Sequence, residues 1–286
     1  MRRSVHTAIG EIEYATIGSG APLLVVHGAG GGFDQGLDFG ATLAQAGFEV
    51  IAMSRFGYLG TPMPEDASAQ AQADAHAALL DALGIERAAI IGASAGAPSS
   101  MQFAIRHPAR CTALVLVVPA AYVPRPGHAK PLLTPPATDF LFSTALRFDF
   151  LFWAGSKLAR RPMIRGLLAT PLAVMDQASP DERARADQIL DRILPVSARR
   201  LGLLNDAYIT STLPRYPLEA IAAPTLVTSV ADDLFGTYDA ARYTAEHIPD
   251  ARFVGYDAGG HVWIGHHLEQ VEEIVSFLRS TVRRAS

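Results

Sequence analysis

The sequence has little cysteine, little excess charge of either sign and no long uncharged apolar stretch. Its single cysteine, Cys111, excludes an intrachain disulfide and a cysteine-based metal cluster, and we expect a small buried side chain there. The 24 basic and 28 acidic residues give a net charge of −4, which argues against nucleic acid as a partner. The most apolar segment, 140–155, contains Arg147 and Asp149 and is too short to span a bilayer.

A secretory signal is also missing from the sequence as given. Met1-Arg2-Arg3 is followed by mixed polar residues and Gly10 instead of an apolar core, so we expect a cytoplasmic protein. A chain of 286 residues is long enough to bury a large core as one domain with an insertion. The composition leaves the number of subunits open, and a homo-oligomer is compatible with it.

The most informative stretch is residues 88–97, where an apolar run leads through a small-residue turn into helix-compatible sequence. The turn reads Gly92-Ala93-Ser94-Ala95-Gly96. A buried strand that reverses sharply into a helix strains one residue and requires tiny neighbours, which the glycines and alanines supply. This geometry exposes the Ser94 hydroxyl and leaves the Ala95 N–H at a helix start, where anions are favoured.

This turn resembles the GxSxG nucleophile elbow of the α/β-hydrolase superfamily. A second glycine-rich segment, Gly28-Ala29-Gly30-Gly31-Gly32, directly follows the apolar run 22–27 and is similar to the family's oxyanion loop. The resemblance implies that the Ala29 N–H is the second oxyanion donor, with Gly30 as the neighbouring candidate. We interpret Arg55 as a structural residue that braces loops and His27 as a residue that holds its own loop.

Apolar runs alternate with helical patterns along most of the chain. A hairpin over 4–17 precedes buried-strand runs at 22–27, 48–53, 88–91 and 113–118, and two more follow at 224–230 and 251–256. Such alternation predicts an α/β fold with a parallel sheet and right-handed crossovers. The resemblance implies the α/β-hydrolase fold, a mostly parallel eight-stranded sheet with helices on both faces.

The alternation stops between residues 120 and 222, which are rich in proline and lack a clear buried strand. We therefore expect residues 1–119 and 223–286 to form the core domain, and the resemblance implies that 120–222 form a helical cap inserted after the sixth strand. An apolar cluster in this insertion is expected to face the sheet domain and to favour a small-molecule substrate with an apolar or aromatic portion. Its members are Phe140, Leu141, Phe142, Phe148, Phe150, Leu151, Phe152 and Trp153.

Two acidic residues and one histidine follow the last two predicted strands. Asp232 and Asp233 come after 224–230, and His261 follows a Gly-Gly pair after 251–256. Their side chains are expected at the same sheet edge as Ser94, in the order Ser, Asp, His that the family has. We favour Asp233 over Asp232 as the acid, although Val230 and Thr237 replace the glycine and proline of the family's GxxDxxxP pattern.

These residues predict acyl transfer to water without a metal or organic cofactor. His261 would deprotonate Ser94, Asp233 would orient the imidazole, and the Ala29 and Ala95 amides would bind the oxyanion. The leading substrate class is a small carboxylic ester. Hydrolysis of a carbon–carbon bond in a diketone, or of a lactone, uses the same groups. A role of another class, a small-molecule receptor with a slow hydrolase site, stays open.

Overall fold

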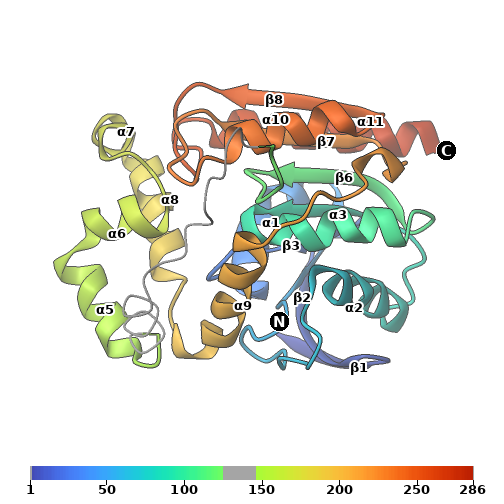
Figure 1. Cartoon of the computed structure of the whole chain (residues 1–286), viewed down its shortest axis with the longest axis horizontal. Coiled ribbons are helices and arrows are strands. Elements are labelled where there is room, and N and C mark those ends of the chain that lie inside the picture. The colour runs from blue at the N-terminus through green and yellow to red at the C-terminus, as the bar shows by residue number, and fades with distance from the viewer. Residues whose placement is uncertain (1, 125–145, 286) are drawn as a thin grey trace.

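One mixed sheet organises the computed structural model, which describes residues 2–124 and 146–285 (Figure 1). Eight strands of the described residues lie in the order β1-β2-β4-β3-β5-β6-β7-β8. They are β1 (Arg3–Thr7), β2 (Gly10–Ile17), β3 (Ala21–Val26), β4 (Phe48–Met53), β5 (Ala88–Ala93), β6 (Cys111–Val117), β7 (Thr225–Val230) and β8 (Ala251–Tyr256).

The pairing of these strands confirms the predicted hairpin and the predicted parallel sheet. β1 pairs with β2, and β2 with β4, in antiparallel register, whereas every pair from β4 through β3 to β8 is parallel. The central strands are buried along almost their whole length, which explains why their sequences are continuous apolar runs. The carboxyl ends of β3, β5, β7 and β8 therefore meet at one edge.

Helices cover both faces of the sheet, as predicted. Residues of α2 (Ala69–Ala82), α3 (Ala97–Arg106) and α10 (Thr237–His247) share one apolar core with the sheet, and those of α1 (Phe33–Gln45) and α11 (His267–Ala285) share the other. Ser68 caps α2 by accepting a hydrogen bond from the Ala71 N–H. Cys111 is buried at the start of β6, and burial raises the pKa of its thiol to about 12.

The described chain between β6 and β7 consists of helices joined by loops and contains no strand. Its helices are α5 (Asp149–Leu158), α6 (Arg160–Leu167), α7 (Leu172–Gln177), α8 (Pro180–Asp191) and α9 (Arg200–Ser211). A third apolar core joins Leu146, Ile164 and Leu190 of this segment to Val262 and Ile264 of the loop after β8. These helices therefore pack against the part of the sheet edge that carries His261.

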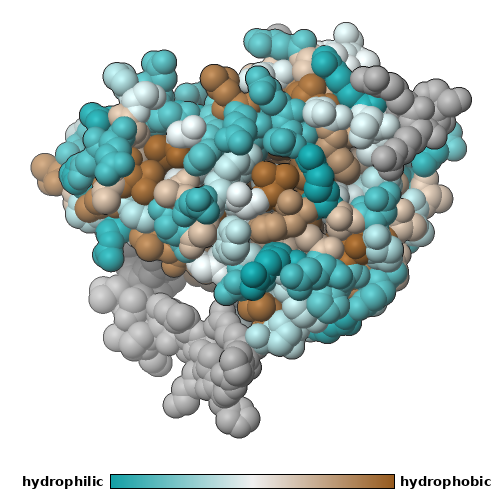
Figure 2. Space-filling view, turned by 90° about the horizontal axis from the view of Figure 1, so that it is seen from above, coloured by the Kyte–Doolittle hydropathy of each residue, from teal (hydrophilic) through white to brown (hydrophobic). Residues whose placement is uncertain are grey.

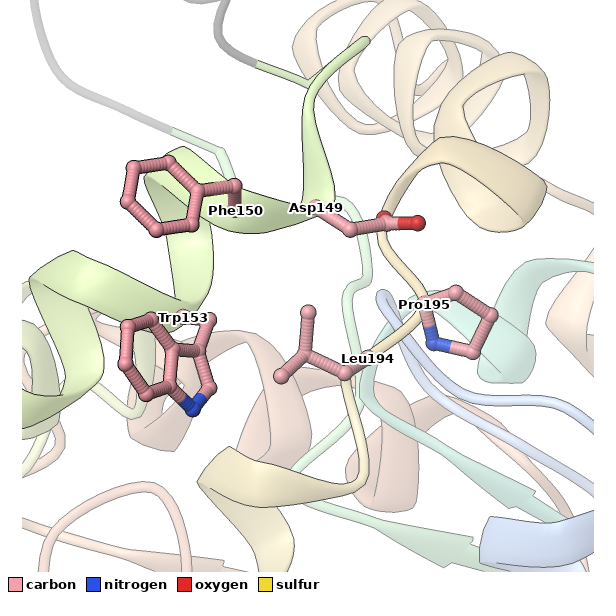
Figure 3. A pocket seen from close by; sticks show the side chains of 5 residues that line it. All are labelled: Asp149, Phe150, Trp153, Leu194 and Pro195. Atoms are coloured by element: carbon pink, nitrogen blue, oxygen red, sulfur yellow. The ribbon is translucent and has the colours of Figure 1, made fainter.

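The predicted orientation of the apolar cluster is wrong for four residues of α5 and its N-terminal flank. Phe148, Phe150, Leu151 and Trp153 are each about half exposed or more, with Phe150 at 69%. Phe150 and Trp153 stack and, with Asp149, Leu194 and Pro195, line a shallow depression (Figure 3). A short helix that is apolar all round buries only one stripe, here on the side of Phe152 and Ser156. Phe140, Leu141 and Phe142 lie outside the described residues.

The surface is mixed in character. Hydrophilic residues dominate the face seen in Figure 2, with apolar residues gathered in small patches between them. Within 2–124 and 146–285, no helix combines the length and apolarity needed to cross a membrane. The same residues contain no group of three or more His, Cys, Asp or Glu side chains placed to hold a metal ion.

The buried His76 ring is expected to make the free energy of unfolding depend on pH. Its ring is buried in α2 between Met53 Sδ and Ser99 Oγ, and burial, with the Arg55 and His107 charges, lowers its pKa to about 3. Below about pH 6.5 the unfolded chain binds a proton at His76 that the folded chain does not, so stability falls by about 1.4 kcal/mol per pH unit. We expect His76→Gln to remove this slope, and wild type to lose about 2 kcal/mol more than the variant between pH 6.5 and 5.

Urea unfolding at both pH values measures this difference. His6→Gln, which changes an exposed histidine of β1, is the matched control and should keep the wild-type slope. Parallel stability curves for wild type and His76→Gln would contradict the prediction.

Candidate active site

Ser94 occupies a strained turn at the carboxyl end of β5. Its φ of 48° lies in the left-handed region, and residues 94–96 form a 3-10 turn that leads directly into α3. A non-glycine residue seldom adopts this backbone conformation, and it persists only where the surroundings impose it. The strain predicted from the GxSxG spacing is therefore present at the serine itself.

Three glycines permit this turn, because a side chain would clash at two of their positions and be tightly crowded at the third. A Cβ at Gly92 would lie 2.4 Å from Ser100 Oγ, and a Cβ at Gly96 would lie 2.6 Å from the carbonyl oxygen of His27. At Gly28 it would lie 3.2 Å from Ser94 Cβ. Helix α3 and the loop after β3 thus approach the serine closely.

His261 links Ser94 to Asp233 through two hydrogen bonds. The distance from His261 Nε2 to Ser94 Oγ is 2.8 Å, and that from His261 Nδ1 to Asp233 Oδ2 is also 2.8 Å. Such geometry fits a neutral imidazole that donates from Nδ1 to the carboxylate and accepts the serine hydroxyl at Nε2. The three side chains come from the ends of β5, β7 and β8, as the sequence predicts.

Asp233 is buried and held ionised. Burial raises the pKa of its carboxyl, but the His261 ring, the Thr237 hydroxyl and the Phe235 N–H together lower the pKa below its usual range. Phe235 N donates to Oδ1 at 2.8 Å, and Thr237 Oγ1 donates to Oδ2. From the sequence, Thr237 is noted only as a departure from the family pattern. The hydrogen bond from its hydroxyl to Asp233 was not predicted.

Asp232 lies beside the acid but contacts a different part of the histidine loop. Its Oδ1 accepts the Gly259 N–H at 2.9 Å and the Gly260 N–H at 2.7 Å. Adjacent carboxylates thus have separate partners, the imidazole for Asp233 and the preceding backbone for Asp232.

The loop after β3 lies against Ser94 and supplies the candidate oxyanion donors. Ala29 is exposed between buried Gly28 and Gly30, and the Ala95 N–H is at the start of the 3-10 turn. Gly30 N donates to Tyr58 Oη at 3.3 Å. Because the Gly30 amide is engaged, the geometry favours Ala29 over Gly30 as the second donor.

His27 and Arg55 hold this loop through hydrogen bonds with its backbone. His27 Nδ1 donates to the Gly28 carbonyl at 2.7 Å, and its Nε2 accepts the Arg55 N–H at 3.0 Å. Burial, and next the Arg55 charge, hold the pKa of His27 well below its usual range, so the ring is neutral. Arg55 also donates to the His27 and Gly28 carbonyls, in line with the structural role expected for both residues.

A buried ion pair connects this loop to the helical segment. Asp206 of α9 accepts from both Arg55 Nη atoms at 2.6 Å and from Tyr58 Oη at 2.5 Å. Arg199, which is fully buried, donates to the Gly31 carbonyl at 2.5 Å and pairs with Asp34 at 2.6 Å. No local pattern predicts these partners, since Arg55 and Asp206 are 151 residues apart.

The same segment contacts the groups around the triad. The Ala169 carbonyl accepts from Leu234 N at 3.0 Å and from His261 N at 3.4 Å, and so joins the acid loop to the histidine loop. Ile193 lies over Gly30, where its side chain is 3.3 Å from an added Cβ. The Phe235 ring meets the His261 ring edge-on, with 4.8 Å between centroids. Apolar groups therefore border both the oxyanion loop and the histidine.

Known proteins are similar to this chain in sequence. A family model described as alpha/beta hydrolase fold matches residues 21–265. The chain is 27% identical to the uncharacterized hydrolase YcgS of Bacillus subtilis (strain 168), over 98% of this chain and 100% of that protein. It is 29% identical to a 2-hydroxy-6-oxononadienedioate/2-hydroxy-6-oxononatrienedioate hydrolase of Paraburkholderia xenovorans (strain LB400), over 93% of this chain and 89% of that protein.

A solved structure has the same fold. An alpha/beta hydrolase fold protein from Nakamurella multipartita superposes with a TM-score of 0.71 at 29% identity, covering 98% of this chain and 99% of that one. The match of the family model to most of the chain, together with the mixed sheet and the strained serine turn, leads to one conclusion. This chain belongs to the alpha/beta hydrolase fold family.

Proposed function

We propose that this protein is a serine hydrolase that cleaves a small, uncharged carboxylic ester through an acyl-enzyme intermediate. The observation that supports this most is the unbroken series of hydrogen bonds from Ser94 through His261 to Asp233. A serine hydroxyl is a poor nucleophile at neutral pH, and an adjacent oriented base is what activates it.

The reaction has two steps on these groups. Ser94 Oγ attacks the ester carbonyl while His261 Nε2 takes its proton, and the same proton then goes to the departing alcohol. Water, deprotonated by His261, next attacks the acyl-enzyme and releases the acid. The Ala29 and Ala95 amides stabilise the oxyanion in both steps, and loss of one such donor typically lowers kcat by about 10²- to 10³-fold.

The charges around the oxyanion loop favour an uncharged substrate. Arg55 and Arg199 contact this loop and are paired with Asp206 and Asp34. A substrate carboxylate would compete with these pairs for a donor, whereas an ester with an apolar portion would contact Ile193 and Phe235.

The domain division belongs to this proposal. Residues 1–119 and 223–286 are assigned to the core domain and 120–222 to a helical cap. The contacts of Ala169, Arg199 and Asp206 with the loops at the sheet edge support a cap that helps to shape the site.

Carbon–carbon bond hydrolysis is the second candidate, because several relatives are named as hydrolases of 2-hydroxy-6-oxononadienedioate. Such a compound carries a ketone at carbon 6, which Ser94 would attack in place of an ester carbonyl. The leaving group is then a carbon that must be protonated, and the dicarboxylate needs cationic partners. The pairing of Arg55 and Arg199 argues against that substrate.

The test treats wild type and Ser94→Ala with a fluorophosphonate and reads intact mass. We expect one adduct on wild type and none on the variant, since only an activated serine displaces fluoride from phosphorus. Turnover is then compared for p-nitrophenyl acetate to octanoate, a small lactone and a 2-hydroxy-6-oxo dienoate. Ester turnover within the usual enzyme range of about 1 to 10³ per second is the expected result.

Other outcomes contradict parts of this proposal. Faster turnover of the dienoate than of every ester would assign the carbon–carbon reaction. Absence of an adduct on wild type, with no turnover on the panel, would overturn the hydrolase assignment and favour a receptor that uses the same pocket for binding.

A further inference from the structure

We propose that Asp232 is a positioning residue for His261, an inference that rests on the proposed hydrolase function. Its carboxylate fixes the backbone of the two residues before the histidine. The imidazole is thereby kept within hydrogen-bond distance of Ser94 Oγ throughout turnover.

Two acceptors bind the amide groups of residues 259–261. Gly259 N and Gly260 N donate to Asp232 Oδ1 at 2.9 and 2.7 Å, and His261 N donates to the Ala169 carbonyl at 3.4 Å. The two short bonds are those to Asp232. Its carboxylate is therefore the stronger restraint on the backbone that carries the catalytic imidazole.

This backbone needs such a restraint because its two glycines can adopt many backbone conformations. Gly259 has a φ of 144° and Gly260 a φ of 64°, conformations that glycine adopts readily and leaves as readily. Larger residues are excluded, since a Cβ at Gly260 would lie 2.6 Å from Thr170 and one at Gly259 would lie 3.0 Å from the Ile264 carbonyl. The loop thus gains its reach across the site from glycine. Its position is fixed by the Asp232 bonds to the two N–H groups, together with the bonds from Ile264 N to the Gly259 carbonyl at 2.8 Å and from Trp263 N to the Gly260 carbonyl at 3.1 Å.

The two neighbouring carboxylates therefore both position His261, but through different groups. Asp233 is buried and orients the ring through Nδ1, whereas Asp232 is half-buried and orients the main chain. A displacement of about 1 Å in a catalytic group can cost about 10²-fold in rate, so loss of the main-chain bonds should appear in kcat. Binding of substrate should change little, because Asp232 contacts the loop and not the site of the acyl group.

The experiment compares Asp232→Ala, Asp232→Asn and Asp233→Ala with wild type, using the best ester substrate and fluorophosphonate labelling. Asp232→Ala removes both acceptor bonds and is expected to lower kcat and the labelling rate by about 10- to 100-fold, with KM within about twofold. Asp232→Asn keeps a side-chain oxygen that accepts both N–H groups and should be at least about fivefold more active than Asp232→Ala. Asp233→Ala should lose far more activity than either variant.

Asp257→Ala is the matched control, because it removes an exposed carboxylate from the same loop. It should keep wild-type kcat. All assays are run well below the thermal midpoint of each variant, so that unfolding is not read as lost activity. Wild-type kcat in Asp232→Ala would overturn the inference, as would equal losses in Asp232→Ala and Asp232→Asn. If the proposed hydrolase function itself is wrong, wild type will neither be labelled by the fluorophosphonate nor turn over the ester. That result differs from both outcomes above.

Discussion

Ser94→Ala and His261→Ala are each expected to lower kcat by about 10⁶-fold, and the double variant should lose no more than either single one. The 2.8 Å bond between Oγ and Nε2 makes nucleophile and base one functional unit, so removal of either abolishes covalent catalysis. Asp233→Ala should lower kcat by about 10⁴-fold, because the ring loses its orientation but the base remains. Initial rates on the best ester, measured at high enzyme concentration, check all four values.

The matched control is Ser99→Ala. Ser99 is a buried serine of the same chain segment, but its hydroxyl bonds to His76 and the Gly96 carbonyl. Its loss should leave kcat within about threefold of wild type. Additive losses in Ser94→Ala and His261→Ala would contradict a shared mechanism. More than about one per cent of wild-type activity in Ser94→Ala would show that another group performs the attack.

The second large effect concerns stability. Asp206→Ala is expected to lower the free energy of unfolding by about 3 to 5 kcal/mol, because it leaves the Arg55 guanidinium buried without its anion. The two side chains are only 1% and 4% exposed, and Asp206 also accepts the Tyr58 hydroxyl. Arg55→Met combined with Asp206→Leu should recover part of the loss, since apolar groups carry no charge to desolvate. Urea unfolding of the two variants and wild type measures these free energies.

Asp74 offers a matched comparison on the surface. It pairs with Arg106 at 2.7 Å, but both side chains are more than a third exposed, so Asp74→Ala should cost less than about 1 kcal/mol. If Asp206→Ala were as mild as Asp74→Ala, the buried pair would contribute little, and the tie between α9 and the oxyanion loop would not be a source of stability.

The Asp206 pair also holds the loop proposed to bind the oxyanion. Tyr58 accepts the Gly30 N–H and donates to Asp206, so this helix-borne carboxylate helps to set the loop that carries Ala29. The loops at the sheet edge therefore make stabilising contacts with the helical segment as well as with the sheet. A change in the packing of α9 would reach the oxyanion donors through these bonds.

The sequence by itself determined the strands, the order of the elements and the residues that meet at the sheet edge. These features depend on local chemistry: apolar runs mark buried strands, and glycines on either side of Ser94 permit a strained turn. Parallel strands then bring their carboxyl ends to one edge, so chain order places Ser94, the Asp232–Asp233 pair and His261 together.

Only the tertiary structure decided which carboxylate meets the imidazole and which holds its backbone. Asp232 and Asp233 are chemically identical neighbours, and the direction of each side chain depends on the loop that packs against it. The same holds for the Arg55–Asp206 pair and for α5, where Phe150 and Trp153 are exposed although the sequence analysis predicted that they face the sheet domain. Composition and periodicity report how apolar a segment is, whereas the packing partner is set by contacts between residues far apart in the chain.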